Sequence, residues 1–370
     1  MKISEYATRL LLSCLVCFAA YAPAQAQEKF TYDGPVITLR YSTFIPETHP
    51  MVKASIKPWE EMVERESNGK IKFKTYYSGT LHGAKDGFKA TVNDITDLTH
   101  AYVNYQPGSF HLLHVLDLPF AFPNAMVAAK VAEELYPKYF KKEYEAMGVY
   151  LADYGANGSY NLFTKKPVIT LEQLKGMKIR SAGGTSTSIL SALGAVPVSV
   201  PVSEAYSAFQ RGLVDGVAIY NTGAVGYRVS ELATNMTEIS MNNPTNGYAF
   251  NRKTWDAFPP EVKRFMYVMF RLRSVMSAIT TDEKDIESRK AFVAQGMKIH
   301  QLPPAELARW KAAVAPLWDK FIADNEAQGR PAKALVADLH ALSKKYENWT
   351  PEQFLKDARE HPTPGIISGM

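Results

Sequence analysis

Residues 171–220 read LEQLKGMKIRSAGGTSTSILSALGAVPVSVPVSEAYSAFQRGLVDGVAIY. Within this stretch, 177–181, 196–200 and 214–220 are short segments expected to be strands, and the segments between them have helical character. Such alternation predicts an α/β unit built on a sheet. Arg180 stands near the end of the first of these strands, where a guanidinium can hold a carboxylate through two parallel hydrogen bonds.

A similar alternation precedes this stretch, at residues 36–103. Strands are expected at 36–42, 71–77 and 98–103, with helices at 51–66, where Pro58 predicts a kink or a late start, and at 86–93. This order implies a parallel sheet, whose carboxyl edge is where ligands bind in open α/β folds. The strand ends and following loops carry candidate ligand contacts, which could equally be packing residues: Phe44, Tyr77, Tyr102, Asn104 and Tyr105.

The chain divides into four parts on these patterns. We expect a signal peptide at 1–26, a first α/β lobe at 27–150 and a second α/β lobe at 151–258. Residues 261–292 hold neither Gly nor Pro and predict one helix of more than 30 residues, about 45 Å long, which could lie across both lobes. The rest of 259–370 has helical character and is expected to pack on both lobes.

The first 26 residues have the features of an export signal. Lys2 and Arg9 precede an apolar run, Leu10 to Ala20, that is too short to span a membrane. Ala24-Gln25-Ala26 then gives a small-x-small cleavage pattern. An uncleaved anchor and a lipoprotein are the alternatives. Both cysteines, Cys14 and Cys17, fall inside this segment, so the exported chain would have no disulfide or thiolate chemistry.

Other chemistries have little support in the sequence. The formal net charge of +5 is spread along the chain without long basic runs, so nucleic acid is not an expected partner. His111, His114 and Asp117 could in principle supply metal ligands, but the sequence has no His-Glu-x-x-His, and we expect ordinary packing and no metal. A Gly-x-Ser-x-Gly elbow and a phosphate-binding Gly-Lys-Ser/Thr are both missing, so we expect neither an enzyme nor a cofactor.

The motifs in 171–216 carry a family resemblance. LKGMKIR at 174–180, LGAVPV at 193–198 and EAYSAFQRGLVDG at 204–216 resemble, in order and spacing, the periplasmic solute-binding proteins of TRAP transporters, the DctP-like dicarboxylate-binding family. The resemblance covers essentially the whole exported chain. It implies a two-lobed periplasmic-binding-protein fold, a long helix spanning both lobes, and a salt bridge from Arg180 to the ligand carboxylate.

The sequence departs from that family pattern in two places. Many members carry a second arginine before the motif, where this chain has Tyr160, and a DGxEN segment, where this chain is apolar until Tyr220 and Asn221. We expect Tyr160, Tyr220 and Asn221 to serve the pocket instead. A single guanidinium among several tyrosines favours a monocarboxylate over a small dicarboxylate, and aromatic acids are among the ligands that this pattern would suit.

The resemblance also implies the mechanism and the partners. We expect an organic acid to dock between the lobes, the lobes to close by a hinge motion, and a TRAP permease to recognise the closed form. The protein is expected to act in the periplasm as a monomer. A sensor that presents its ligand to a receptor kinase, and a binder of small dicarboxylates, are the alternatives.

Overall fold

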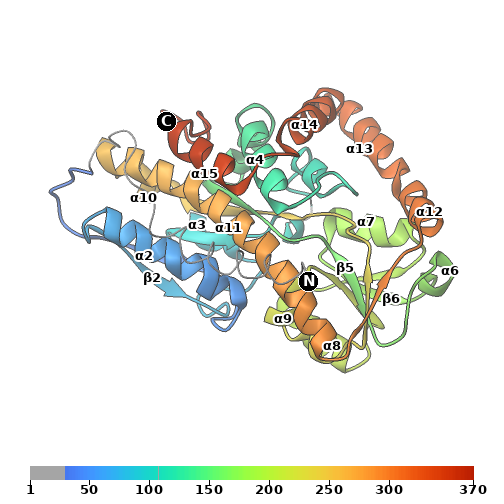
Figure 1. Ribbon diagram of the computed structural model, residues 1–370. Coiled ribbons are helices and arrows are strands. Elements are labelled where there is room, and N and C mark those ends of the chain that lie inside the picture. Colours follow the sequence, from blue (N-terminus) through green and yellow to red (C-terminus); the bar gives the residue numbers. More distant parts are fainter. Residues whose placement is uncertain (1–29, 107) are drawn as a thin grey trace, which may run out of the picture.

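The computed structural model describes residues 30–106 and 108–370, so the predicted signal peptide lies outside the described residues. Two sheets organise the chain (Figure 1). The first sheet has, in spatial order, β2 (Ile71–Tyr76), β1 (Ile37–Ser42), β3 (Leu98–Ala101), β10 (Thr245–Asn251) and β4 (Val149–Ala156). The second has β11 (Lys298–Gln301), β9 (Asn235–Glu238), β5 (Asn161–Thr164), β8 (Gly216–Ile219), β6 (Lys178–Ser181) and β7 (Val196–Ser199).

Helices surround both sheets. They are α2 (Lys57–Glu66), α3 (Gly87–Val92), α4 (Ala125–Leu135), α5 (Lys141–Ala146), α6 (Leu171–Leu174), α7 (Gly184–Ala192), α8 (Ala205–Gln210), α9 (Asn221–Gly226), α10 (Arg252–Asp256), α11 (Pro260–Ala294), α12 (Pro304–Val314), α13 (Pro316–Glu326), α14 (Ala332–Tyr346) and α15 (Pro351–Glu360). Single turns of 3₁₀ helix lie at Val103–Tyr105, Leu113–Asp117, Val202–Glu204 and Val229–Glu231, and π-helical turns at Val52–Ile56 and Tyr136–Phe140. The kink expected near Pro58 is the junction between the π turn Val52–Ile56 and α2, where the proline occupies the first turn and needs no N–H donor.

The parallel pairing expected from the sequence is confirmed for three neighbouring strands of each sheet. In the first sheet, β1 pairs in parallel with both β2 and β3. In the second, β6 pairs in parallel with both β7 and β8. Antiparallel strands complete both sheets, since β10 lies between β3 and β4, and β5 lies between β8 and β9. The fold is therefore the expected α/β architecture with two mixed sheets.

Sheet membership differs from the boundaries expected at residues 151 and 258. β4 and β10 both belong to the first sheet, although most of β4 and all of β10 fall within 151–258. β11, from the expected C-terminal helical part, adds a strand to the second sheet. Local periodicity locates a strand but not its partner, because strand pairing is a long-range choice. The chain thus crosses between the sheets several times.

The long helix α11 runs 35 residues, about 52 Å, and joins the two halves of the molecule (orange in Figure 1). It packs on β4 and α4 beside the first sheet and on α9 beside the second. Two aspartates of this helix each bind the start of another helix. Asp282 accepts hydrogen bonds from the N–H groups of Ala125 and Met126 at 3.0 and 3.2 Å, and Asp285 accepts one from Thr222 N–H at 2.7 Å. The carboxylates suit these helix N-termini, which present free N–H groups.

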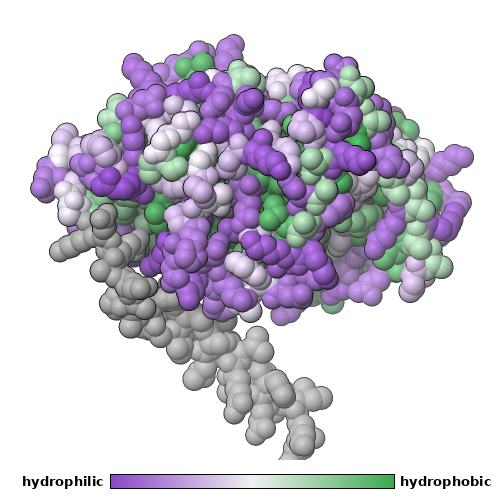
Figure 2. Space-filling model, turned by 90° about the horizontal axis from the view of Figure 1, so that it is seen from above, coloured by the Kyte–Doolittle hydropathy of each residue, from purple (hydrophilic) through white to green (hydrophobic). Residues whose placement is uncertain are grey.

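The C-terminal helices α12 to α14 extend along one side, and α15 packs on α11 (Figure 1). The chain then ends in a buried turn, where Ile366 and Ile367 are almost completely buried and Gly365 O accepts a hydrogen bond from Lys141 Nζ. In the face that Figure 2 shows, hydrophilic residues predominate and apolar residues lie among them. Across residues 30–106 and 108–370, every helix is too short or too polar to span a bilayer.

Candidate functional site

Arg180 is completely buried at the end of β6. Its Nε donates to the carbonyl oxygen of Val200 at 3.0 Å, and its Nη1 donates to that of Ala218 at 3.4 Å. Its Nη2 has no hydrogen-bond partner among the described residues. Two backbone carbonyls thus orient the guanidinium while one of its arms stays available for an anion.

Tyrosines surround the guanidinium. Burial raises the pKa of Tyr105, Tyr160 and Tyr227, and the nearby charge of Arg180 opposes that rise in each case. These phenols therefore stay protonated at neutral pH and can donate hydrogen bonds. The environment of Arg180 combines one fixed positive charge with neutral O–H donors, which suits a carboxylate.

A pocket lies beside this group, between the two halves of the molecule. It comprises about 660 Å³ of empty space, a volume that includes the part open to solvent. Its ring-bearing lining residues are Phe44, His49, His100, Tyr102, Tyr105, Tyr160, Tyr220, Tyr227 and Tyr248. Its other lining residues are Ile45, Met51, Ser55, Ile56, Gly155, Ala156, Asn157, Val202, Asn246, Ser277 and Thr281. Among the described residues, no aspartate, glutamate, lysine or arginine belongs to this lining.

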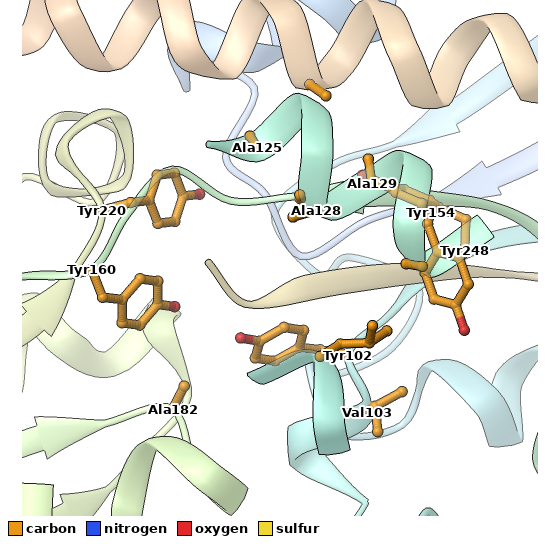
Figure 3. Packing of buried hydrophobic residues seen from close by; sticks show 14 of the residues in the cluster. Tyr102, Val103, Ala125, Ala128, Ala129, Tyr154, Tyr160, Ala182, Tyr220 and Tyr248 are labelled. Atoms are coloured by element: carbon orange, nitrogen blue, oxygen red, sulfur yellow. The ribbon is translucent and has the colours of Figure 1, made fainter. Parts of the chain in front are cut away.

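Tyrosine side chains from both halves face one another in this pocket (Figure 3). Tyr160 and Tyr220 stack with ring centroids 5.9 Å apart and ring planes 22° apart. The hydroxyl of Tyr160 points toward that of Tyr102, which has no hydrogen-bond partner in the described part of the chain. The three phenols thus give the pocket an apolar wall with polar tips.

One hydrogen bond joins the halves directly at the pocket. Tyr105 follows the first sheet's β3, and its hydroxyl accepts a hydrogen bond at 2.9 Å from the N–H of Val202, which follows the second sheet's β7. Because both residues line the pocket, this bond closes one of its sides.

Five of the residues expected at the site line the pocket: Phe44, Tyr102, Tyr105, Tyr160 and Tyr220. Arg180 is not part of the lining, but its charge acts on the phenols of Tyr105 and Tyr160, which are.

Besides Arg180, three of the expected residues lie outside the lining. Asn104 Nδ2 donates to Asp117 Oδ2 at 2.6 Å, and Asn221 Nδ2 donates to Asp285 O at 3.3 Å. Tyr77 is half-buried, with Lys57 Nζ 5.7 Å from its ring centroid. Position after a strand predicts proximity to the carboxyl edge, but the local turn decides whether a side chain points inward.

Several lining residues were missed from the sequence. His49 and His100 had no motif to mark them. Ser277 and Thr281 did leave a signal, because two small polar residues four positions apart share one face of the long helix. Tyr248 reaches the pocket from β10, where the pairing with β4 shifts register between Tyr248 and Ala249. Such an irregularity redirects side chains and cannot be seen in one strand alone.

The possible metal ligands have other roles. Within 30–106 and 108–370, no three histidine, cysteine, aspartate or glutamate side chains are grouped so as to hold a metal ion. Asp117 accepts hydrogen bonds from Asn104 and from the N–H of Thr245 at 3.3 Å, and burial raises its pKa to about 7. Burial also lowers the pKa of His114 to about 4, so this imidazole stays neutral.

Known proteins are similar to this chain in sequence and in fold. The model of bacterial extracellular solute-binding proteins, family 7 (DctP), matches residues 41–325. The C4-dicarboxylate-binding periplasmic protein DctP of Rhodobacter capsulatus is 24% identical over 324 residues, which cover 85% of this chain and 94% of that protein.

Solved structures show the same fold. A TRAP solute-binding protein of Rhodoferax ferrireducens, in complex with copurified benzoate, superimposes with a TM-score of 0.80 at 23% identity, covering 84% of this chain and 99% of that one. A marine-metagenome TRAP solute-binding protein specific for aromatic acids, in complex with 3-hydroxybenzoate, gives a TM-score of 0.80 at 24% identity, covering 85% and 100%.

The family match spans well over half of the sequence, and the chain therefore belongs to the DctP family of bacterial extracellular solute-binding proteins. This is a family of binding proteins of TRAP transporters, not of enzymes, and the two-lobed fold with its long spanning helix is the fold of that family.

Proposed function

We propose that this protein captures an organic monocarboxylate with an aromatic body in the periplasm and delivers it to a TRAP permease. The observation that carries the proposal is the buried Nη2 of Arg180, which has no partner among the described residues and lies beside a pocket rich in tyrosine. A guanidinium without a carboxylate partner is costly to bury, and an anionic ligand would satisfy it.

The chemistry of the lining favours one charge on the ligand. Arg180 would hold the carboxylate, with hydroxyl donors from Tyr105 and Tyr160 beside it. Since no cationic side chain lines the described pocket and Arg180 would already hold the first carboxylate, a second carboxylate would be buried without compensation. Stacked and edge-on contacts from Tyr102, Tyr160 and Tyr220 would suit a flat apolar body.

The relatives are compatible with this ligand class and with its alternative. The two solved structures of the same fold hold benzoate and 3-hydroxybenzoate, whereas the Rhodobacter relative is a C4-dicarboxylate-binding protein. Their identities to this chain are low, so the lining residues of this chain are the stronger argument for an aromatic monocarboxylate.

The proposed mechanism is closure of two lobes, each built on one sheet, about the long helix. The bond between Val202 N–H and the hydroxyl of Tyr105 would form on closure and help to exclude water, which strengthens the charge-assisted bonds to Arg180. We propose that the export signal at 1–26 is removed, that the protein acts as a monomer without nucleic acid, and that the ligand is released unchanged.

The test is a lysine substitution at Arg180, measured by titration calorimetry with benzoate, 3-hydroxybenzoate and succinate. Arg180→Lys keeps the charge but loses the planar fork, so affinity should fall by roughly 1.5–3 kcal/mol, the usual scale of a hydrogen bond to a charged group. Arg65→Lys is the matched control, because the side chain of Arg65 is 69% exposed and does not belong to the pocket lining, and it should bind like the wild type.

Two outcomes would contradict the proposal. Unchanged affinity in Arg180→Lys would remove Arg180 from the carboxylate site. Tighter binding of succinate than of either aromatic acid by the wild type would favour the dicarboxylate alternative.

A further inference from the structure

The pocket carries a second group of polar side chains on the first sheet and the long helix. These are His100 on β3, Asn246 on β10, Asn157 directly after β4, and Ser277 on α11. Arg180 lies on the second sheet, so the pocket has a charged side and a neutral polar side.

His100 is held rigidly between two other lining rings. Its imidazole stacks on Phe44, with ring centroids 4.5 Å apart and ring planes 20° apart. It also stacks on Tyr248, with centroids 4.8 Å apart and planes 17° apart. The residue is 5% exposed, and neither ring nitrogen has a partner of ordinary hydrogen-bond geometry in the described residues, although Asn246 lies beside it. A neutral imidazole always offers one donor and one acceptor. Leaving both unpaired in a buried site is unfavourable, so a polar partner would be stabilised there.

The two asparagines present a complementary pair of groups. Asn246 Nδ2 donates to Asn157 Oδ1 at 2.9 Å. This bond leaves the Asn246 carbonyl oxygen as an acceptor and the Asn157 amide as a donor, and both residues line the pocket. Gly155 leaves space beside them, because a Cβ at this position would lie 3.6 Å from the ring of Tyr248 and 4.0 Å from Ser277 Oγ and would fill that space.

The groups on this side are all uncharged and offer donors together with acceptors. A hydroxyl matches such a set because it donates and accepts at once, whereas a second carboxylate offers acceptors only. A bare hydrocarbon edge would leave the imidazole and amides unpaired.

We infer that His100 and the Asn157–Asn246 pair form a second subsite that recognises a hydroxyl on the body of the ligand, so that the ligand class is a hydroxylated aromatic monocarboxylate. The inference rests on the proposed function, because it places the carboxylate of the same ligand on Arg180. His100 is then the residue that decides between a hydroxylated acid and its parent.

The test compares benzoate and phenylacetate with their 3- and 4-hydroxy derivatives by titration calorimetry, on protein unfolded and refolded to remove any carried ligand. The wild type should bind at least one hydroxylated acid roughly tenfold or more tightly than its parent. His100→Phe keeps a ring between Phe44 and Tyr248 but removes both nitrogens, so it should bring this ratio close to one while retaining the affinity for the parent acid.

A matched control and a second variant accompany this substitution. His114→Phe makes the same chemical change at a partly buried histidine outside the pocket lining and should keep the wild-type ratio. Asn246→Ala should also lower the ratio of the two affinities, as His100→Phe does. It tests the subsite if His100→Phe does not fold.

The outcomes separate the subsite from the proposed function. Equal affinity of the wild type for hydroxylated and parent acids would overturn the second subsite alone. So would a loss of affinity in His100→Phe and in Asn246→Ala that is the same for the hydroxylated and the parent acids. Binding of none of these acids by the wild type would overturn the proposed function and the subsite with it.

Discussion

The buried ion pair behind the pocket gives the sharpest stability prediction. Arg273 Nη1 and Asp153 Oδ2 are 2.8 Å apart, and the two side chains are 3% and 1% exposed. Arg273 also donates to the hydroxyl of Tyr41 at 2.9 Å, and its guanidinium carbon lies 3.7 Å from the ring centroid of Tyr248, which lines the pocket. The pair therefore supports the wall of the site as well as the core.

Asp153→Asn removes one charge with little change of shape. It leaves the buried charge of Arg273 without the carboxylate that compensates it, and removing one partner of a buried pair costs about 3–5 kcal/mol. For a chain of this size, the unfolding entropy of about 0.7 kcal/mol/K converts that loss into a fall in melting temperature of roughly 4–7 °C. Because Tyr248 rests on Arg273, ligand affinity should fall as well.

Urea unfolding followed by circular dichroism measures the loss directly. The control is Asp324→Asn, which breaks an ion pair with Lys320 whose side chains are 61% and 69% exposed, and which should cost under about 1 kcal/mol. Adding Arg273→Met to Asp153→Asn should recover part of the loss, because no uncompensated charge then remains. A loss below about 1 kcal/mol in Asp153→Asn would refute the reasoning, since the guanidinium would then be stable without its carboxylate.

Two further predictions concern acid stability and the C-terminal turn. Burial lowers the pKa of His100 to about 3 from an ordinary 6.5, so the unfolded chain binds a proton that the folded chain does not, and this contribution to stability is lost as pH falls from about 6.5 toward 3. Between pH 6.5 and 4.5 the wild type should lose roughly 2 kcal/mol more than His100→Phe in urea titrations, and parallel pH curves would contradict this. Ile367→Ala should lower the free energy of unfolding by about 2–5 kcal/mol because Ile367 is 1% exposed. The control Ile286→Ala, at a side chain that is 59% exposed, should lower it by less than about 0.5 kcal/mol. Equal melting temperatures of the two variants would show that the turn does not stabilise the fold.

Much of the fold could be predicted because its signals are local. The strands at 37–42, 71–76 and 178–181 and the helix at 260–294 lie within a few residues of their expected bounds. Strand and helix periodicities are properties of neighbouring residues, and they survive folding wherever one face is buried. The motif around Arg180 was informative for the same reason, since a short strand and its turn carry it.

The composition of the pocket was less predictable. Tyr77 and Tyr102 both follow strands of the first sheet, yet only Tyr102 lines the pocket. His100 gains its two stacking partners from Phe44 and from Tyr248, which are 56 and 148 positions away in sequence. No local pattern encodes such contacts.

The sequence by itself therefore determined the α/β class, the long helix and the placement of Arg180 at a strand end, because periodicity and short motifs act over a few residues. Only the tertiary structure decided which strands share a sheet and which side chains surround the pocket. The return of β10 beside β3 and β4 brings Asn246 and Tyr248 to His100, and the register of that pairing fixes where they point. Strand pairing is set by packing across the whole chain, and the neutral side of the site depends on it.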